Sequence, residues 1–396
     1  MTPGSIAGCY VHLPFCDRIC PYCDFAVVKH DRSRATRYVD ALLREIAQSP
    51  QSRHPVRTIF LGGGTPSALE AEQIARVLDA LFRRFDVPRG VECTLEANPT
   101  RGAADLAAWL GAGVTRLSIG VQSLDDGELH RLGRDHTAQQ AMEFARAARA
   151  AGFENVSIDL IAGAPGQTVA GFRRSVVRAI ECGPEHVSIY GMTIEPGTPY
   201  AIWHARDPSA FPDDDTVAEM LVCADEALAS AGYRHYEISN FAKPGWECQH
   251  NIGYWRQRDC IAFGLSAAGY LDGTRYRNAR GFEDYCTAIE SGASARVDVE
   301  RLDFARRVGE AAMLALRMDA GIEDDDFRRR FAIEPALAFE NARNKCSAAG
   351  LLETDARGAR LTERGRLLAN DVCAEFLTPN LETPAVAAER KGASIP

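Results

Sequence analysis

Three cysteines within one short stretch are the residues of this chain best suited to chemistry. In YVHLPFCDRICPYCDF, Cys16, Cys20 and Cys23 have the spacing C-x3-C-x2-C and directly follow an apolar, strand-like run. Three thiolates on one irregular loop can bind three irons of a [4Fe-4S] cubane and leave the fourth iron without a protein ligand. Because an iron with an open position can bind a small molecule, the spacing predicts a reactive cluster.

Two other interpretations of these cysteines stay open. A zinc ion usually takes four protein ligands, and the nearest candidates for the fourth, His12 and His30, would have to fold back over the loop. Cys20 and Cys23 could instead form a redox pair. We favour the cluster because the motifs that follow fit it. The remaining nine cysteines are scattered, and for most of them, Cys248 excepted, we expect a small buried hydrophobic side chain.

The elements that must position this loop are alternating strands and helices. From Cys9 to about Thr193, apolar β-rich runs alternate with helical patterns, which is typical of repeated βα units and a parallel sheet. A helix is predicted over residues 69–85. Periodicity suits both an open doubly wound sheet and a partial barrel, and in either the strands' carboxyl ends face one crevice. The predicted strands are residues 8–13, 56–62, 91–97, 115–121, 155–161 and 186–192.

Beyond Met192 the alternation ends. Residues 193–215 are rich in Pro, Gly and Asp and predict an ordered loop or linker. A helix over 214–232 and short strands near Tyr236 and Ile261 are expected to close the first domain.

From about Leu302, consecutive helices and a hairpin near residues 355–358 resemble a winged helix. We interpret this region as a packing or partner module without DNA contact. The expected divisions are a core at 1–235, a barrel-closing region at 236–298, a helical domain at 299–378 and a disordered tail at 379–396.

Composition excludes several classes of protein. At 396 residues and 46% hydrophobic content, the chain can bury one large core and a smaller second one. The 45 Lys and Arg against 54 Asp and Glu give a formal charge of −9, so no general attraction to nucleic acid is expected. The sequence has neither a basic leader nor an apolar run long enough to span a bilayer, which predicts a soluble cytoplasmic protein.

The cysteine loop and the motifs LGGGTPS and LEANP resemble the radical S-adenosylmethionine (radical SAM) superfamily. Within it, the chain resembles the branch of oxygen-independent coproporphyrinogen III oxidase and the heme chaperone HemW family, over nearly its whole length. The resemblance implies an α/β fold, a partial (β/α)6 TIM-like barrel with a smaller, mainly helical, winged-helix-like C-terminal domain. It also implies S-adenosylmethionine, chelated to the open iron by its amino and carboxylate groups.

Several strand ends could hold this cosubstrate, which needs backbone acceptors, a cation, hydroxyl partners and an apolar slot. Glycine at Gly62, Gly63 and Gly64, before Thr65, lets the backbone approach closely, so that carbonyls can receive the amino group. Arg134 could pair with the carboxylate, and Asp159, within an apolar strand, needs a partner such as the ribose hydroxyls. The resemblance adds the cosubstrate contacts Glu96, Gln122, Tyr10 and a loop aromatic near the adenine, either Tyr22 or Phe25.

The branch is indicated by HNIGYW, which contains His250, Asn251, Tyr254 and Trp255 and resembles the HNxxYW signature of HemW. Phe25 stands where the oxidases carry an additional cysteine, and only fifteen residues precede Cys16, where the oxidases have an extension. The resemblance therefore implies a protein that binds heme and delivers it to acceptors such as membrane respiratory enzymes.

His250 is the leading candidate for heme contact, with the thiolate of Cys248 as the alternative. An equally open interpretation is that His250 caps its loop while the motif's aromatic residues pack in the core. The alternative function is a radical enzyme that decarboxylates a porphyrinogen, and the third is a zinc-bearing winged-helix regulator. No nucleic-acid partner is expected, and the oligomeric state stays open, a homodimer included.

Overall fold

The computed structural model describes residues 8–49, 55–100 and 103–381, which form two compact units. The larger unit contains the described residues up to 299, except for two short segments, 235–238 and 251–258. The smaller unit contains these segments together with residues 300–381. Most of the predicted tail, residues 382–396, lies outside the described residues. No helix in the described ranges is long and apolar enough to cross a membrane.

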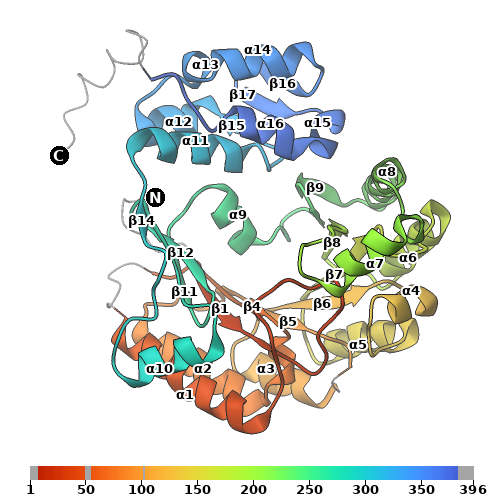
Figure 1. Ribbon diagram of the computed structural model, residues 1–396, viewed down its shortest axis with the longest axis vertical. Coiled ribbons are helices and arrows are strands. Elements are labelled where there is room, and N and C mark those ends of the chain that lie inside the picture. Colours follow the sequence, from red (N-terminus) through yellow and green to blue (C-terminus); the bar gives the residue numbers. More distant parts are fainter. Residues whose placement is uncertain (1–7, 50–54, 101–102, 382–396) are drawn as a thin grey trace. The chain divides into compact units, whose positions relative to one another are not determined.

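Parallel strands in chain order form the centre of the larger unit (Figure 1). A doubly wound sheet would reverse its strand order at a switch point, whereas this order runs on in one direction, as in a barrel. The fold prediction is thereby confirmed, and every predicted strand lies within two residues of an observed one. The strands are β1 (Gly8–Leu13), β4 (Thr58–Gly63), β5 (Glu92–Ala97), β6 (Arg116–Gln122), β7 (Asn155–Ala162) and β8 (His186–Gly191).

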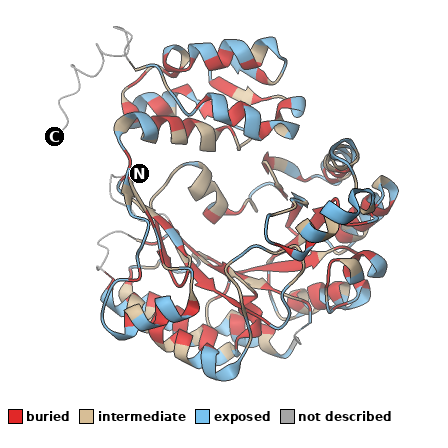
Figure 2. Ribbon diagram, in the orientation of Figure 1, coloured by how far each residue is buried: buried red, intermediate tan, exposed pale blue. Residues whose placement is uncertain are grey.

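Helices follow the strands and bury one face each (Figure 2). In α2, Ile74, Val77, Leu78 and Leu81 recur at helical spacing and are all buried, so this face packs into the main core. Glu70 and Gln73 form a capping box that satisfies the first turn of α2. The helices between the parallel strands are α1 (Arg32–Gln48), α2 (Ala71–Arg84), α3 (Leu106–Gly111), α4 (Asp126–Arg131), α5 (Ala138–Ala150) and α6 (Val169–Glu181), with the short 3-10 helices η1 (Pro66–Ala68) and η2 (Ala103–Asp105).

Further strands extend the sheet on both sides. β11 (Cys260–Phe263) pairs parallel with β1, and β10 (Asn240–Ala242) pairs antiparallel with β8. β12 (Ala268–Leu271) and β13 (Thr274–Arg277) continue beyond β11 as an antiparallel hairpin. Other elements up to residue 301 include α8 (Asp214–Ser230), β9 (Arg234–Glu237), α9 (Gln249–Trp255), α10 (Phe282–Glu290) and β14 (Glu300–Arg301).

The prediction of a loop over residues 193–215 is wrong in its middle part. This segment contains α7 (Pro199–Arg206) and the short 3-10 helix η3 (Pro208–Ala210). Thr198 caps α7 because its Oγ1 accepts a hydrogen bond from the Ala201 backbone N–H at 3.2 Å. Pro199 occupies the first helical position, where its missing N–H costs nothing, so it starts a helix here instead of breaking one.

The smaller unit has the expected order of helices followed by a hairpin. Its core contains Val308, Phe327, Phe339, Leu361 and Phe376. β16 (Leu352–Asp355) and β17 (Gly358–Leu361) form the hairpin, and β15 (Ile322–Glu323) pairs with β17. The helices are α11 (Phe304–Ala315), α12 (Asp324–Phe331), α13 (Pro335–Ala338), α14 (Glu340–Ala348), α15 (Glu363–Leu367) and α16 (Ala369–Glu375).

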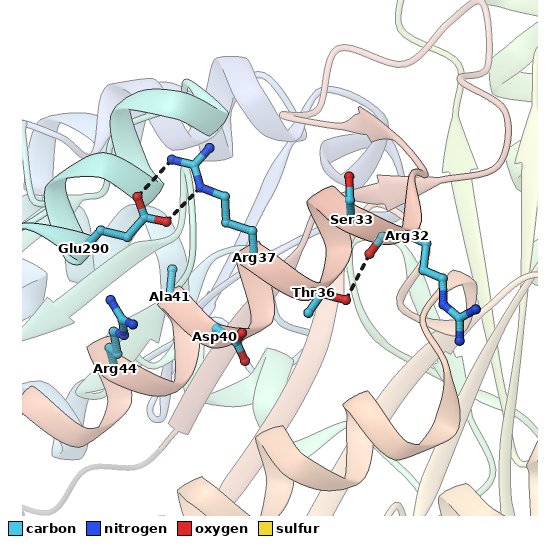
Figure 3. Close-up of a pocket in the computed structure, with 8 residues that line it drawn as sticks. All are labelled: Arg32, Ser33, Thr36, Arg37, Asp40, Ala41, Arg44 and Glu290. Atoms are coloured by element: carbon cyan, nitrogen blue, oxygen red, sulfur yellow. Dashed lines mark hydrogen bonds and ion pairs between the residues drawn. The ribbon is translucent and has the colours of Figure 1, made fainter.

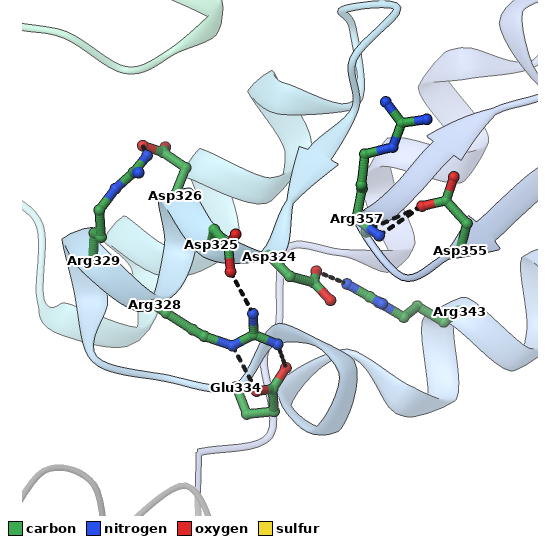
Figure 4. A network of polar contacts seen from close by, with 10 residues as sticks. Asp324, Asp325, Asp326, Arg328, Arg329, Glu334, Arg343, Asp355 and Arg357 are labelled. Carbon is green, nitrogen blue, oxygen red and sulfur yellow. Dashed lines mark hydrogen bonds and ion pairs between the residues drawn. The ribbon is translucent and has the colours of Figure 1, made fainter.

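A polar network joins α12 to α14 in this unit (Figure 4). Arg343 Nη2 donates to Asp324 Oδ1 at 2.5 Å, and both side chains are buried. The neighbouring Asp325 pairs instead with Arg328 at the surface, where 86% of the aspartate side chain is exposed. Two adjacent carboxylates of one helix therefore make a buried and an exposed ion pair.

Removing the buried carboxylate should destabilise the smaller unit much more than removing the exposed one. We expect Asp324→Ala to cost about 3–5 kcal/mol, because it leaves the Arg343 guanidinium buried without its partner. Asp325→Ala, the matched control, should cost at most about 1 kcal/mol. Urea denaturation followed by circular dichroism measures both, and equal losses of stability would contradict this assignment.

Candidate functional site

A pocket of about 440 Å³ lies in the larger unit at the carboxyl ends of the parallel strands. Its wall combines the cysteine loop with residues that lie in or just after β4, β5, β6, β7 and β8. The fold therefore brings together most of the site residues predicted from the sequence. Those that line the pocket are Cys16, Cys20, Tyr22, Cys23, Phe25, Gly63, Gly64, Thr65, Glu96, Gln122, Arg134 and Asp159.

The cysteine loop is fixed at its base. Cys16 lies in β2 (Phe15–Cys16), which pairs with β3 (Val28–Lys29) and so closes the loop between them. Along the loop, Tyr200 of α7 donates its backbone N–H to the Pro21 carbonyl at 3.1 Å. Arg280 Nη2 donates to the Asp24 carbonyl at 2.6 Å. These contacts hold an irregular segment without regular secondary structure of its own.

Two of the three thiols receive hydrogen bonds from neighbouring side chains. The Thr65 hydroxyl donates to Cys16 Sγ at 3.5 Å, and Arg134 Nη1 donates to Cys20 Sγ at 3.6 Å. Burial raises the pKa of the Cys16 thiol to about 11, although the Thr65 bond acts in the opposite direction. Among the described residues, no three His, Cys, Asp or Glu side chains surround a single metal-ion position.

The glycines at the end of β4, Gly63 and Gly64, allow the cysteine loop to come close. The Gly64 N–H donates to the Leu13 carbonyl at 2.9 Å, and the Thr65 N–H donates to the Phe15 carbonyl at 2.8 Å. A Cβ on Gly64 would lie 2.6 Å from the Pro14 backbone. Gly63 has φ +114°, and a Cβ there would lie 2.5 Å from the His12 ring. Both positions therefore require glycine for the close approach of β4 to the base of the cysteine loop.

Two carboxyl groups, Glu96 on β5 and Asp159 on β7, share the pocket wall. Burial and then the nearby Asp159 raise the pKa of Glu96 to about 7. Burial also raises the pKa of Asp159, while hydrogen bonds from the hydroxyls of Ser188, Ser118 and Ser157 lower it. The predicted need of Asp159 for a partner is thus met in part by protein hydroxyls.

Gln122, at the end of β6 between β5 and β7, and Arg134 bring further polar atoms to the pocket. Gln122 ends β6 with φ +67°, and its buried Oε1 has no hydrogen-bond partner among the described residues. Arg134 Nη2 donates to the Gly120 carbonyl at 2.8 Å. A Cβ on Gly120 would lie 3.0 Å from Gln122 Nε2, so the missing side chain lets these groups meet. An acceptor left open in the same pocket wall as a half-buried guanidinium is suited to a polar ligand.

Three predicted residues do not line the pocket. Gly62 lies behind the wall, where a Cβ would approach Glu96 Oε2 to 3.0 Å. The Tyr10 hydroxyl is bonded to His12 Nδ1 at 3.1 Å, and its ring stacks on Phe60 with centroids 6.3 Å apart. His250 is the third and has its own buried environment.

His250 is 2% exposed and is held inside the larger unit. Its Nδ1 is hydrogen-bonded to Thr58 Oγ1 at 2.8 Å, and its ring packs on Phe60. Burial lowers the pKa of His250 to about 3, so the imidazole is neutral. Cys248 is also buried, and its thiol lies 3.5 Å from Glu92 Oε1, the carboxylate that accepts the His250 backbone N–H. Both candidate heme ligands are therefore enclosed by protein.

Sequence reasoning missed one residue of the pocket wall and one buried charge that acts on it. Asn98 follows β5 in LEANP, lines the pocket and accepts a hydrogen bond from Arg134. Arg116 is 2% exposed within β6, and its charge lowers the pKa values of Glu96 and Asp159. The period-2 spacing of Asn98 from Glu96, and a charged residue within the apolar run of β6, are signals that could have identified them.

A second hollow, of about 660 Å³, lies on the outer surface along α1 (Figure 3). Arg37 and Glu290 face each other across it and form two hydrogen bonds of 2.7 and 2.9 Å. Arg32 and Arg44 also line it, but none of the predicted site residues does. This hollow is an exposed surface between ion-paired side chains, so the pocket at the strand ends is the candidate site.

Comparison with known proteins shows which families the chain resembles. Residues 10–178 match the radical SAM superfamily, and residues 305–368 match the HemN C-terminal domain. The chain is 34% identical to the heme chaperone HemW of Lactococcus lactis subsp. lactis, over 94% of this chain and 97% of that protein. It is 40% identical to the heme chaperone HemW of Escherichia coli K12, over 69% of this chain and 74% of that protein.

Among solved structures, coproporphyrinogen III oxidase (HemN) of Escherichia coli matches with a TM-score of 0.82. The match has 22% identity and covers 94% of this chain and 90% of that one. At this identity the likeness establishes the fold.

The raised pKa of Glu96 predicts a pH-dependent stability of the ligand-free protein. Below pH 4.5, the pKa of Glu96 in the unfolded chain, the carboxyl group is neutral in both states. Above about pH 7, its pKa in the folded protein, the carboxyl group is ionised in both states, and the cost of holding that charge inside the protein lowers stability in full. The free energy of unfolding of Glu96→Gln should therefore increase relative to that of wild type as the pH rises between these two values, by at most about 3 kcal/mol.

Denaturant unfolding from pH 4.5 to 8 measures this difference. Glu72→Gln, at an exposed carboxylate in the first turn of α2, is the control and should show no such trend. A difference between E96Q and wild type that stays constant over this pH range would contradict the burial of an ionisable Glu96.

Proposed function

Because the chain belongs to the heme chaperone HemW family of radical SAM proteins, we propose that it binds a [4Fe-4S] cluster, S-adenosylmethionine and heme, and delivers heme to acceptor proteins. The observation that carries this proposal is the single pocket in which three thiols meet a guanidinium and two half-buried carboxyl groups. The alternative, an oxidase that decarboxylates a porphyrinogen, is supported by structural likeness alone.

Cys16, Cys20 and Cys23 would hold three irons of the cluster. The donor set fits, because all three thiols line one pocket and two of them accept hydrogen bonds that stabilise thiolates. When bound, the cluster supplies one-electron chemistry and an iron with an open position. The protein's part is to hold the loop rigid through the pairing of β2 with β3 and to offer donors to the sulfurs.

The rest of the pocket fits S-adenosylmethionine. The backbone of Gly63 and Gly64 would receive the amino group, and Arg134 would pair with the carboxylate. The open acceptor Gln122 Oε1 suits a hydroxyl donor, as do the carboxyl groups of Glu96 and Asp159. Gly62 and Tyr10 lie behind the wall, next to Glu96. Gly62 leaves room for the Glu96 carboxyl group, and burial, followed by the charge of Glu96, raises the pKa of Tyr10.

Of the two aromatic candidates for the adenine, we propose Tyr22. Its ring is half-buried and packs against Tyr200 with centroids 5.8 Å apart, so its position is fixed. Phe25 is 67% exposed, which suits a residue at the rim better than one inside an adenine slot.

Heme contact through His250 rests on family membership. The imidazole can bind iron only if it leaves its buried site, since Nδ1 is bonded to Thr58 and the ring packs on Phe60. Cys248 has the same requirement. We further propose that the acceptors are membrane respiratory enzymes and that delivery takes place in the cytoplasm. A homodimer is compatible with this role.

Replacing the three loop cysteines should abolish the cluster. Protein reconstituted with iron and sulfide under nitrogen should be brown, whereas the Cys16→Ser, Cys20→Ser, Cys23→Ser triple variant should be colourless and lose nearly all bound iron. Cys223→Ser, which removes a half-buried thiol of α8 outside the pocket, is the control and should keep the full iron content. A triple variant that stays brown would place the cluster elsewhere.

Heme binding separates the two candidate functions. The protein should bind heme stoichiometrically, and His250→Ala should weaken binding at least about tenfold if an axial ligand is lost, equivalent to 1.4 kcal/mol. His186→Ala is the matched control, since His186 is also a buried imidazole whose Nδ1 is 2.8 Å from a strand hydroxyl, that of Ser157. Equal binding by H250A and wild type would exclude His250 as the ligand, and catalytic decarboxylation of coproporphyrinogen III would favour the oxidase.

A further inference from the structure

We propose that Asn98 is a positioning residue that directs hydrogen bonds onto two of the three cysteine sulfurs and so sets the reduction potential of the cluster. This inference rests on the proposed cluster. Asn98 lies immediately beyond β5 and lines the pocket. Its backbone N–H donates to the hydroxyl of the fully buried Ser67 at 3.1 Å, which fixes its place.

The Asn98 side chain lies between the two sulfur donors. Its Nδ2 donates to Thr65 Oγ1 at 3.2 Å, and its Oδ1 accepts from Arg134 Nη2 at 2.5 Å. Thr65 in turn donates to Cys16 Sγ, and Arg134 Nη1 donates to Cys20 Sγ. One amide therefore connects the hydrogen bonds at two of the three thiols.

The chemistry of the donors and acceptors allows this series of hydrogen bonds only one direction. A guanidinium can only donate, so the Asn98 oxygen must face Arg134 and its NH2 group must face Thr65. Because Thr65 Oγ1 then accepts from Asn98, its only proton is free to point at Cys16 Sγ. The orientation of the Asn98 amide thus determines where the Thr65 hydroxyl proton goes.

The consequence lies in the charge of the cluster. Hydrogen bonds to the ligating sulfurs favour the more negative, reduced state and raise its reduction potential. In contrast to Asn98, an aspartate here could still accept from Arg134 but has no N–H for Thr65. The Thr65 hydroxyl would then donate to the carboxylate, and its bond to Cys16 would be lost.

A double-mutant cycle tests this coupling without interference from the added charge. The reconstituted wild type, T65V, N98D and T65V/N98D proteins are titrated anaerobically, and the midpoint potential is read from the spectrum of the reduced cluster. T65V should shift the potential to more negative values in the wild-type background and leave it unchanged in the N98D background. Thr94→Val, which alters a buried β5 hydroxyl without a hydrogen-bond partner among the described residues, is the control and should cause no shift.

Equal shifts caused by T65V in the two backgrounds, or no shift in either, would overturn the proposal. If N98D holds too little cluster for titration, the rate of iron loss to a chelator replaces the potential. T65V should then speed this loss in the wild-type background alone, and equal acceleration in both would overturn the proposal. Failure of the wild type itself to assemble a cluster would instead contradict the proposed function.

Discussion

The carboxyl ends of parallel strands must meet at one edge of the sheet, and every group assigned a role in the pocket depends on this constraint. Residues from Cys16 to Asp159 are far apart in the chain, yet they line one pocket because β1, β4, β5, β6 and β7 are neighbours in chain order. Each βα unit adds one strand end to the same edge. The topology therefore determines where the site lies, and the residue at each strand end determines its chemistry.

Placing polar groups at that edge also requires partners for them. The Asp159 carboxyl group accepts from serine hydroxyls, Glu96 accepts the Gly63 N–H at 3.0 Å, and Arg116 supplies a buried positive charge. Gln122 Oε1, an acceptor without a partner among the described residues, belongs to a residue of the pocket wall. A buried polar atom without a partner is costly in a finished core but reasonable where a ligand is to bind.

Much of the fold and most of the site could be predicted because they depend on local pattern. Apolar strands such as residues 8–13 and glycines such as Gly63 are visible in any single segment. The helix α7 could not be predicted because a proline such as Pro199 disrupts a helix in its interior but is favoured at its first position. Asn98 was missed because its role depends on Thr65 and Arg134, which only the folded chain brings to it. The burial of His250 likewise depends on Thr58 and Phe60.

A cubane held by three thiols, with one iron left for a small molecule, is the claim on which the rest depends. Mössbauer spectroscopy of the anaerobically reconstituted protein, enriched in ⁵⁷Fe, tests it most directly. One iron site in four should differ from the other three, and only its spectrum should change when S-adenosylmethionine is added. Four equivalent irons that do not respond to S-adenosylmethionine, or a protein that binds one zinc ion in place of iron, would contradict the claim.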